Sequence, residues 1–190
     1  RAGGARTTIV LAILSVTAYT LAVRRVLPAL LAAASCAWGQ NTQIGATLGG
    51  GGIARLFETS AYLVVGGVEG CVRCGGRVGV FFGYDHWERT GPATDHPTSL
   101  DLAGGGVRVQ GKGARFRPFL DFGLVAGRTV DNRGPFGSTR ESRGAAGGQI
   151  GFGVAIPVSE HWYVRPLARI VGLSSSEFGG FAGASVGYRF

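Results

Sequence analysis

Gly180-Phe181-Ala182-Gly183-Ala184-Ser185-Val186-Gly187-Tyr188-Arg189-Phe190 is the stretch that decides the fold. Counted back from Phe190 to Ala182, every second residue is apolar, and the residues between them are arginine, glycine or serine. This period of two predicts an extended strand with one apolar face. A barrel in lipid needs an apolar outer surface, interfacial aromatic residues and a polar interior. The stretch therefore predicts a lipid-facing strand of a β-barrel.

Seven further stretches have the same patterning. We predict strands at about 43–50, 60–69, 76–86, 99–110, 116–128, 144–156, 161–172 and 180–190. Longer and shorter connections then alternate, as in membrane barrels that have tight periplasmic turns and longer outer loops. The fourth strand loses its phase at Gly104–Gly106, where we expect a β-bulge. The fold class is all-β: an eight-stranded antiparallel up-and-down transmembrane β-barrel, preceded by a helical leader segment.

The uncharged face of each strand is assigned to lipid, because a charge near the bilayer midplane costs roughly 2–4 kcal/mol. Phe82, Phe122 and Phe152 lie on this face. A soluble barrel with an apolar core, such as a lipocalin, would reverse the two faces. Aromatic residues at both ends of the lipid face are expected to anchor the barrel at the interfaces. They are Tyr62 and Tyr84 at the outer rim, and Phe116, Trp162, Tyr188 and Phe190 at the periplasmic rim.

The opposite face carries the charges. Eight strands enclose a space just wide enough for side chains to fill, and buried charges must be paired. We therefore predict a filled interior that contains an arginine–carboxylate network. Its members are Glu69, Arg77, Asp85, Asp101, Arg117, Asp121, Arg165, Arg169 and Arg189. A narrow, porin-like channel with a slight preference for anions is the alternative, because many inward glycines would leave gaps.

Residues 24–39 have the pattern of a secretory signal peptide. Arg24 and Arg25 precede an apolar run, and small residues lead to a cleavage site before Gln40. We interpret residues 1–23 as an over-extended leader and 40–190 as the barrel domain. Without its first 39 residues the chain has a net charge of about +4 rather than +8. The arginines are scattered rather than clustered, which argues against nucleic acid as a partner.

The closing strand and the stretch Ile156–Val164 (IPVSEHWYV) resemble the small OmpA- and OmpX-type barrel family of Gram-negative outer membranes. The resemblance implies an outer-membrane location, and recognition of the C-terminal strand by the barrel-assembly machinery. Members of this family contribute to envelope stability, adhesion or surface recognition, and the fold does not fix which. We expect a monomeric, non-enzymatic surface protein without a cofactor, in contact with outer-membrane lipid and lipopolysaccharide.

A lipid A-modifying enzyme is the rival class. Acyl hydrolysis or transfer would need a nucleophile beside a base. The candidates surround the second outer loop: His86, Glu88, His96, Thr98 and Ser99. They do not match the His-x-Ser pattern of lipid A deacylases. A metal could be bound around the same loop by Asp85, His86, Glu88, Asp95 and His96, but their spacing matches no defined motif. We therefore predict neither catalysis nor a metal site.

Two further groups are candidates for smaller roles. Cys71 and Cys74 are expected to form a structural disulfide in an oxidising compartment, or to remain two idle thiols. The third outer loop holds four arginines, opposed by Asp131 and Glu141 alone. They are Arg128, Arg133, Arg140 and Arg143. Because guanidinium groups pair with phosphate in two-pronged contacts, we expect these arginines to contact phosphorylated surface lipid or an anionic partner, unless the loop is simply solvated.

Overall fold

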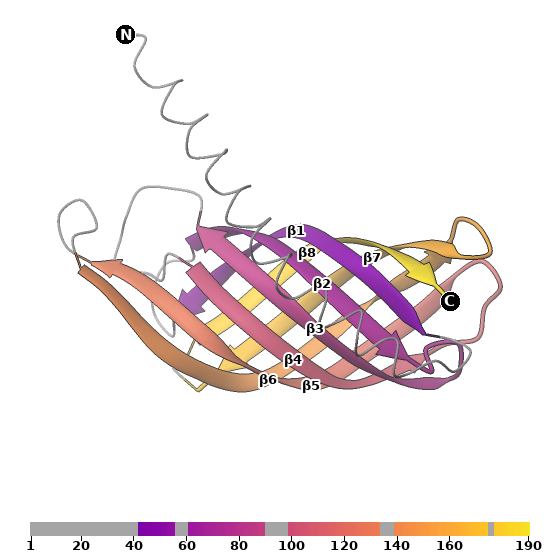
Figure 1. Cartoon of the computed structure of the whole chain (residues 1–190), viewed down its shortest axis with the longest axis horizontal. Helices are drawn as coiled ribbons and strands as arrows, with labels where there is room; N and C mark the ends of the chain where they lie inside the picture. Colours follow the sequence, from indigo (N-terminus) through magenta and orange to yellow (C-terminus); the bar gives the residue numbers. More distant parts are fainter. Residues whose placement is uncertain (1–41, 56–60, 90–98, 134–138, 175–176) are drawn as a thin grey trace, which may run out of the picture. The chain divides into compact units, whose positions relative to one another are not determined.

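The computed structural model describes residues 42–55, 61–89, 99–133, 139–174 and 177–190. The strands are β1 (Gln43–Arg55), β2 (Ala61–Val72), β3 (Val78–Arg89), β4 (Ser99–Gln110), β5 (Arg117–Arg133), β6 (Thr139–Pro157), β7 (Trp162–Leu173) and β8 (Glu177–Arg189). Each pairs antiparallel with its sequence neighbours, and β8 pairs with β1 to close the barrel (Figure 1). The predicted eight-stranded up-and-down barrel is confirmed. The leader segments 1–23 and 24–39 lie outside the described residues.

The barrel has two distinct ends. At the turn end lie the connections 73–77, 111–116 and 158–161, together with Phe190; this is the right-hand end in Figure 1. At the opposite end, called here the loop end, β1, β3, β5 and β7 end and β2, β4, β6 and β8 begin. Among the described residues, no helix is long and apolar enough to cross a membrane.

The strands at the loop end run further than predicted. β5 and β6 continue as a paired hairpin as far as Arg133 and Thr139. β3 reaches Arg89, so Glu88 lies on the strand that already included His86 in the prediction, rather than in a loop. The expected alternation of long and short connections is therefore wrong, because backbone pairing continues into segments whose polar composition predicted loops.

The expected bulge in β4 is also wrong. The pairing of β4 with β3 and β5 runs without interruption through Gly104–Gly106, and Gly105 lies opposite both Phe82 and Leu124. Without an extra residue the two faces of β4 keep their phase along the whole strand. Arg108 therefore faces inward and Asp101 faces outward.

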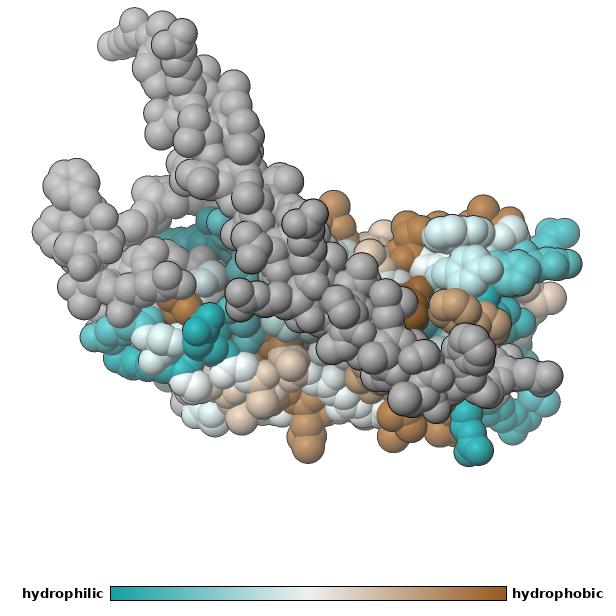
Figure 2. Space-filling view, in the orientation of Figure 1, coloured by the Kyte–Doolittle hydropathy of each residue, from teal (hydrophilic) through white to brown (hydrophobic). Residues whose placement is uncertain are grey.

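The two faces of the wall are those of a barrel in lipid. Phe122 and Phe152 are each 50% exposed on the outside, whereas Arg108 is fully buried inside. Figure 2 shows hydrophobic surface over the strands and hydrophilic surface towards the two ends of the barrel. A soluble barrel with an apolar core would show the reverse. The predicted outward direction of the apolar face is confirmed.

Side chains fill the interior in two layers. The middle holds charged residues, described below. Towards the loop end lies an apolar plug, in which the Trp87 and Phe181 rings meet edge to face with centroids 5.5 Å apart. Around them pack Ile53, Val65, Leu100, Leu102, Val171 and Leu173. A barrel of this size closes itself with its own side chains.

Candidate functional site

Arg108 lies at the centre of the barrel interior and is fully buried. Its Nε and Nη2 atoms donate to the two carboxylate oxygens of Asp121, each at 2.7 Å. Nη1 donates to Glu69 Oε1 at 3.2 Å. The guanidinium lies 4.6 Å from the centroid of the Phe119 ring, so it has both carboxylate and aromatic partners.

Glu69 joins three arginines from two sides of the barrel. Besides Arg108, it accepts a hydrogen bond from Nη2 of Arg165, and its Oε2 lies 3.5 Å from Nη2 of Arg169. Arg169 also donates to Asp85. β2, β3, β4, β5 and β7 are thus linked by a single set of ion pairs, called here the ion network: Glu69, Asp85, Asp121, Arg108, Arg165 and Arg169.

The ion network is electrically balanced, with three carboxylates against three guanidinium groups. The cavity beside it measures about 10 Å³ and is lined by Glu69, Asp85 and Arg169 among others. That is room for about one water molecule. Balanced charge and dense packing allow the network to hold the barrel wall together, and this described cavity is too small for a ligand larger than water.

The sequence predicted most of the ion network. As predicted, the structure brings together Glu69, Asp85, Asp121, Arg165 and Arg169. Arg77, Arg117 and Arg189 lie instead at the turn end. Arg108 was missed because the expected bulge obscured the phase of β4. A strict period of two carried through the three glycines would have found it.

Asp101 does not belong to the interior, so that prediction is wrong. It lies on the outer face and accepts hydrogen bonds from the Tyr84 hydroxyl at 2.6 Å and from His86 Nδ1 at 2.7 Å. Nη2 of Arg128 lies 3.6 Å from its second oxygen. Charge is tolerated here because the cluster lies towards the loop end of β3, β4 and β5, above the apolar band.

Among the described residues, the outer-face cluster has an Asp–His pair without the nucleophile of a hydrolytic site. A triad needs a hydroxyl or thiol that is hydrogen-bonded to the histidine. In the described part of the chain the hydrogen-bond partner of His86 is Asp101, and Ser99 makes no such contact. Nor does that part contain a group of three or more His, Cys, Asp or Glu side chains arranged to hold a metal ion. His96 and Thr98 lie outside the described residues.

Aromatic side chains gather on the outside of the turn end. Tyr188 meets Trp162 at 5.4 Å and Phe190 at 5.1 Å between ring centroids, both edge to face. Phe116 is exposed at the same end. Tyr84 is half-buried on the outer face towards the loop end, and the side chain of Tyr62 lies outside the described residues. This distribution suits interfacial anchoring at the turn end.

The structure joins Cys71 and Cys74 as a disulfide with a Cα–Cα distance of 5.8 Å, and both residues are buried. Of the four loop-end arginines, Arg128 and Arg143 have side chains more than half exposed. Arg143 donates to Glu141 at 2.9 Å. Arg133 and Arg140 stand at neighbouring register positions on β5 and β6, and their side chains lie outside the described residues.

The chain is similar to several solved structures. Neisserial surface protein A shares 14% sequence identity with a TM-score of 0.67, over 78% of this chain and 97% of its own. The N-terminal β-barrel domain of Pseudomonas aeruginosa OprF shares 17% with a TM-score of 0.56, over 80% and 99%. Ail, the attachment invasion locus protein of Yersinia pestis, shares 13% with a TM-score of 0.55, over 80% and 99%.

No family model and no curated protein sequence matches the chain. At these identities the likeness concerns the fold. The closed strand order agrees with it along the described residues. The chain therefore has the fold of the small eight-stranded outer-membrane β-barrels.

Proposed function

We propose that this chain is an integral outer-membrane β-barrel with a structural or surface-interaction role rather than an enzymatic one. It is exported through a cleaved signal peptide and assembled through its C-terminal strand. The loop end faces the outside of the cell and the turn end faces the periplasm. The barrel works as a monomer without a cofactor.

One observation carries this proposal: the wall is apolar outside and charged inside. Leu124 is 75% exposed on the outer face, whereas Arg165 and Asp121 are almost fully buried within. Exposing a continuous belt of such side chains to water would oppose folding, and hydrocarbon removes that cost. The fold of the solved neighbours agrees with a place in the outer membrane.

The packing of the interior favours a closed barrel rather than a channel. A conducting path would have to cross both the ion network and the apolar plug, where the fully buried Trp87 and Leu100 sit opposite each other on paired strands. Conductance measured in planar bilayers separates the two functions. We expect no stepwise current from the purified barrel, and defined single-channel steps would favour the channel.

The loop end supplies the surface for interaction. Arg128 and Arg143 are exposed. In the described part of the chain, Arg128 has Asp101 as its carboxylate neighbour within 4 Å, and Arg143 has Glu141. Their remaining donors can pair with the phosphate groups of lipopolysaccharide. Replacing Arg128, Arg133, Arg140 and Arg143 by serine should weaken lipopolysaccharide binding, and unchanged binding would remove this contact from the proposal.

The test of the main proposal is fractionation of cells that express the full chain. We expect the protein in the outer-membrane fraction. On a denaturing gel, the unheated folded barrel should migrate at a different position from the heated, unfolded chain. Recovery in the soluble periplasmic fraction would refute the location. Mass spectrometry of lipid A should show no change upon expression, and a lost or added acyl chain would revive the enzymatic alternative.

A further inference from the structure

The turn end of the barrel contains a cavity that the ion network does not fill. Its volume is about 330 Å³, and it is lined by Gly75, Gly76, Arg77, Gln110, Gly111, Lys112, Gly113 and Arg117. This cavity is called here the turn-end mouth. It falls in the size range of pockets for small ligands, which begins at about 300 Å³.

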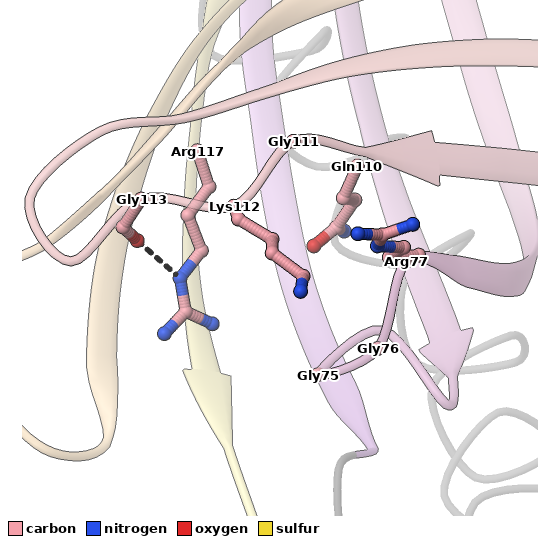
Figure 3. A pocket seen from close by; sticks show the side chains of 8 residues that line it. All are labelled: Gly75, Gly76, Arg77, Gln110, Gly111, Lys112, Gly113 and Arg117. Carbon is pink, nitrogen blue, oxygen red and sulfur yellow. Dashed lines mark hydrogen bonds between the residues drawn. The ribbon is translucent and has the colours of Figure 1, made fainter.

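Three cations reach the turn-end mouth from three parts of the chain. Arg77 ends the 73–77 turn, Lys112 lies in the 111–116 connection and Arg117 begins β5. Figure 3 shows their side chains around one space, with Gln110 between Arg77 and Lys112. No carboxylate is among the lining residues of this described cavity. The wall therefore presents positive charge alone.

The backbone around the mouth is fixed in place. Gln110 N donates to the carbonyl of Arg77 at 2.8 Å, and Gly111 N donates to the carbonyl of Pro118 at 2.7 Å. Arg117 Nε donates to the carbonyl of Gly113 at 3.0 Å, which orients the guanidinium and leaves its two Nη groups pointing away from that bond (Figure 3). The backbone that carries the three cations and the Arg117 guanidinium are thus ordered before any ligand arrives, which lowers the cost of binding.

The rest of the interior cannot neutralise these charges. The carboxylates Glu69, Asp85 and Asp121 are matched by the three guanidinium groups of the ion network. Arg189, on β8, adds a further positive charge that interacts electrostatically with Arg117, although it does not line the mouth.

We propose that the turn-end mouth binds the phosphate group of a small soluble phosphomonoester. Phosphate offers up to two negative charges and oxygens on several sides, which suits two guanidinium groups and one ammonium group that converge from different directions. The volume exceeds that of one phosphate ion, so a small organic group fits beside it. Arg117 and Gln110 belong to the inner face of the barrel, which favours a soluble ligand over a lipid headgroup.

The site requires only the closed barrel, so its failure would leave the proposed function intact. The test is an NMR titration of the full chain, folded in a phosphate-free non-ionic detergent, with inorganic phosphate and with glycerol 3-phosphate. Sodium chloride at matched ionic strength is the reference. We expect saturable amide shifts confined to residues 75–77 and 110–117, with tighter binding of glycerol 3-phosphate.

Matched variants sharpen the test. Lys112→Gln combined with Arg117→Gln should weaken binding at least about tenfold, and Lys112→Gln alone should weaken it less. Arg115→Gln is the control for Lys112→Gln, because it removes one positive charge from the same 111–116 connection but does not line the mouth, and it should change binding less than about twofold. Lys112 is exposed, so Lys112→Gln alone keeps the barrel folded if the double variant does not. Shifts that do not saturate, that chloride reproduces, or that Arg115→Gln weakens equally would overturn the proposal.

A second arm separates the sources of phosphate. The same amides are followed in bicelles with and without phosphatidylglycerol. Saturable shifts with glycerol 3-phosphate support the soluble ligand. Shifts with phosphatidylglycerol alone overturn that assignment in favour of a lipid headgroup.

Discussion

Glu69 lies among three buried arginines. It accepts hydrogen bonds from Arg108 and Arg165 and lies 3.5 Å from Arg169. Each of these guanidinium groups is almost fully removed from water. The free energy of the network therefore depends on complete pairing, because a buried charge without its counter-charge is far costlier than a pair.

We predict that Glu69→Gln lowers the free energy of unfolding by about 3–5 kcal/mol, because three buried arginines lose the carboxylate that they share. Denaturant unfolding of the reconstituted barrel measures this change. Glu160→Gln is the matched control: Glu160 is exposed in the 158–161 connection and should matter by less than about 0.5 kcal/mol. Equal effects of the two substitutions would contradict the role given to Glu69.

The Cys71–Cys74 disulfide closes a very short loop, so its effect on stability should be modest. We expect dithiothreitol to lower the unfolding free energy by about 2 kcal/mol at most. The variant with both cysteines replaced by serine should not respond to the reductant. An identical response of the two proteins would show that the cysteines are not bonded.

At the scale of elements, inward glycines set how closely neighbouring strands and side chains approach. Gly123 on β5 lies opposite Gly106 on β4. A Cβ at Gly123 would come within 2.5 Å of the carbonyl oxygen of Gly105 and 3.0 Å of the Phe81 ring. The space that these glycines leave is occupied by Phe81, whose ring lies beside Arg108. In the sequence, the same glycines had suggested gaps in the interior and therefore a channel.

We predict that Gly123→Ala destabilises the barrel by about 1–3 kcal/mol, because the added methyl group would clash with the backbone of Gly105, which is fixed by the pairing of β4. Gly144→Ala on β6 is the control, since nothing lies within 4 Å of a Cβ there. Urea or guanidinium unfolding of both variants is the measurement. A barrel that accepts alanine at 123 as readily as at 144 would refute the close packing.

The strands and their faces could be predicted because side chains alternate with a period of two in any strand. Three consecutive glycines in β4 removed that signal, so the phase on either side was assigned from charge. Charge misled at Asp101, because the outer face becomes polar near the loop end. The partners of Glu69 and the turn-end mouth could not be predicted, because they depend on which residues from distant strands meet across the barrel.

At the scale of the whole barrel, charge and hydrophobicity are separated into regions. An apolar belt that includes Leu124, Ile150 and Ile170 covers the outside. The ion network is neutral in sum, and the turn end is positive at Arg77, Lys112 and Arg117. The apolar belt suits contact with lipid, the ion network satisfies the need to pair buried charges, and the charged turn end is in contact with water.

The central claim is that the apolar face meets lipid, and tryptophan quenching by brominated acyl chains tests it most directly. Trp38, Trp87 and Trp162 are replaced by phenylalanine, and a single tryptophan is placed by Phe122→Trp or Phe152→Trp. A control protein keeps Trp87 alone, which is fully buried in the interior. In bilayers brominated at mid-chain, we predict strong quenching at positions 122 and 152 and little at Trp87. Unquenched fluorescence at 122 and 152 would contradict the account.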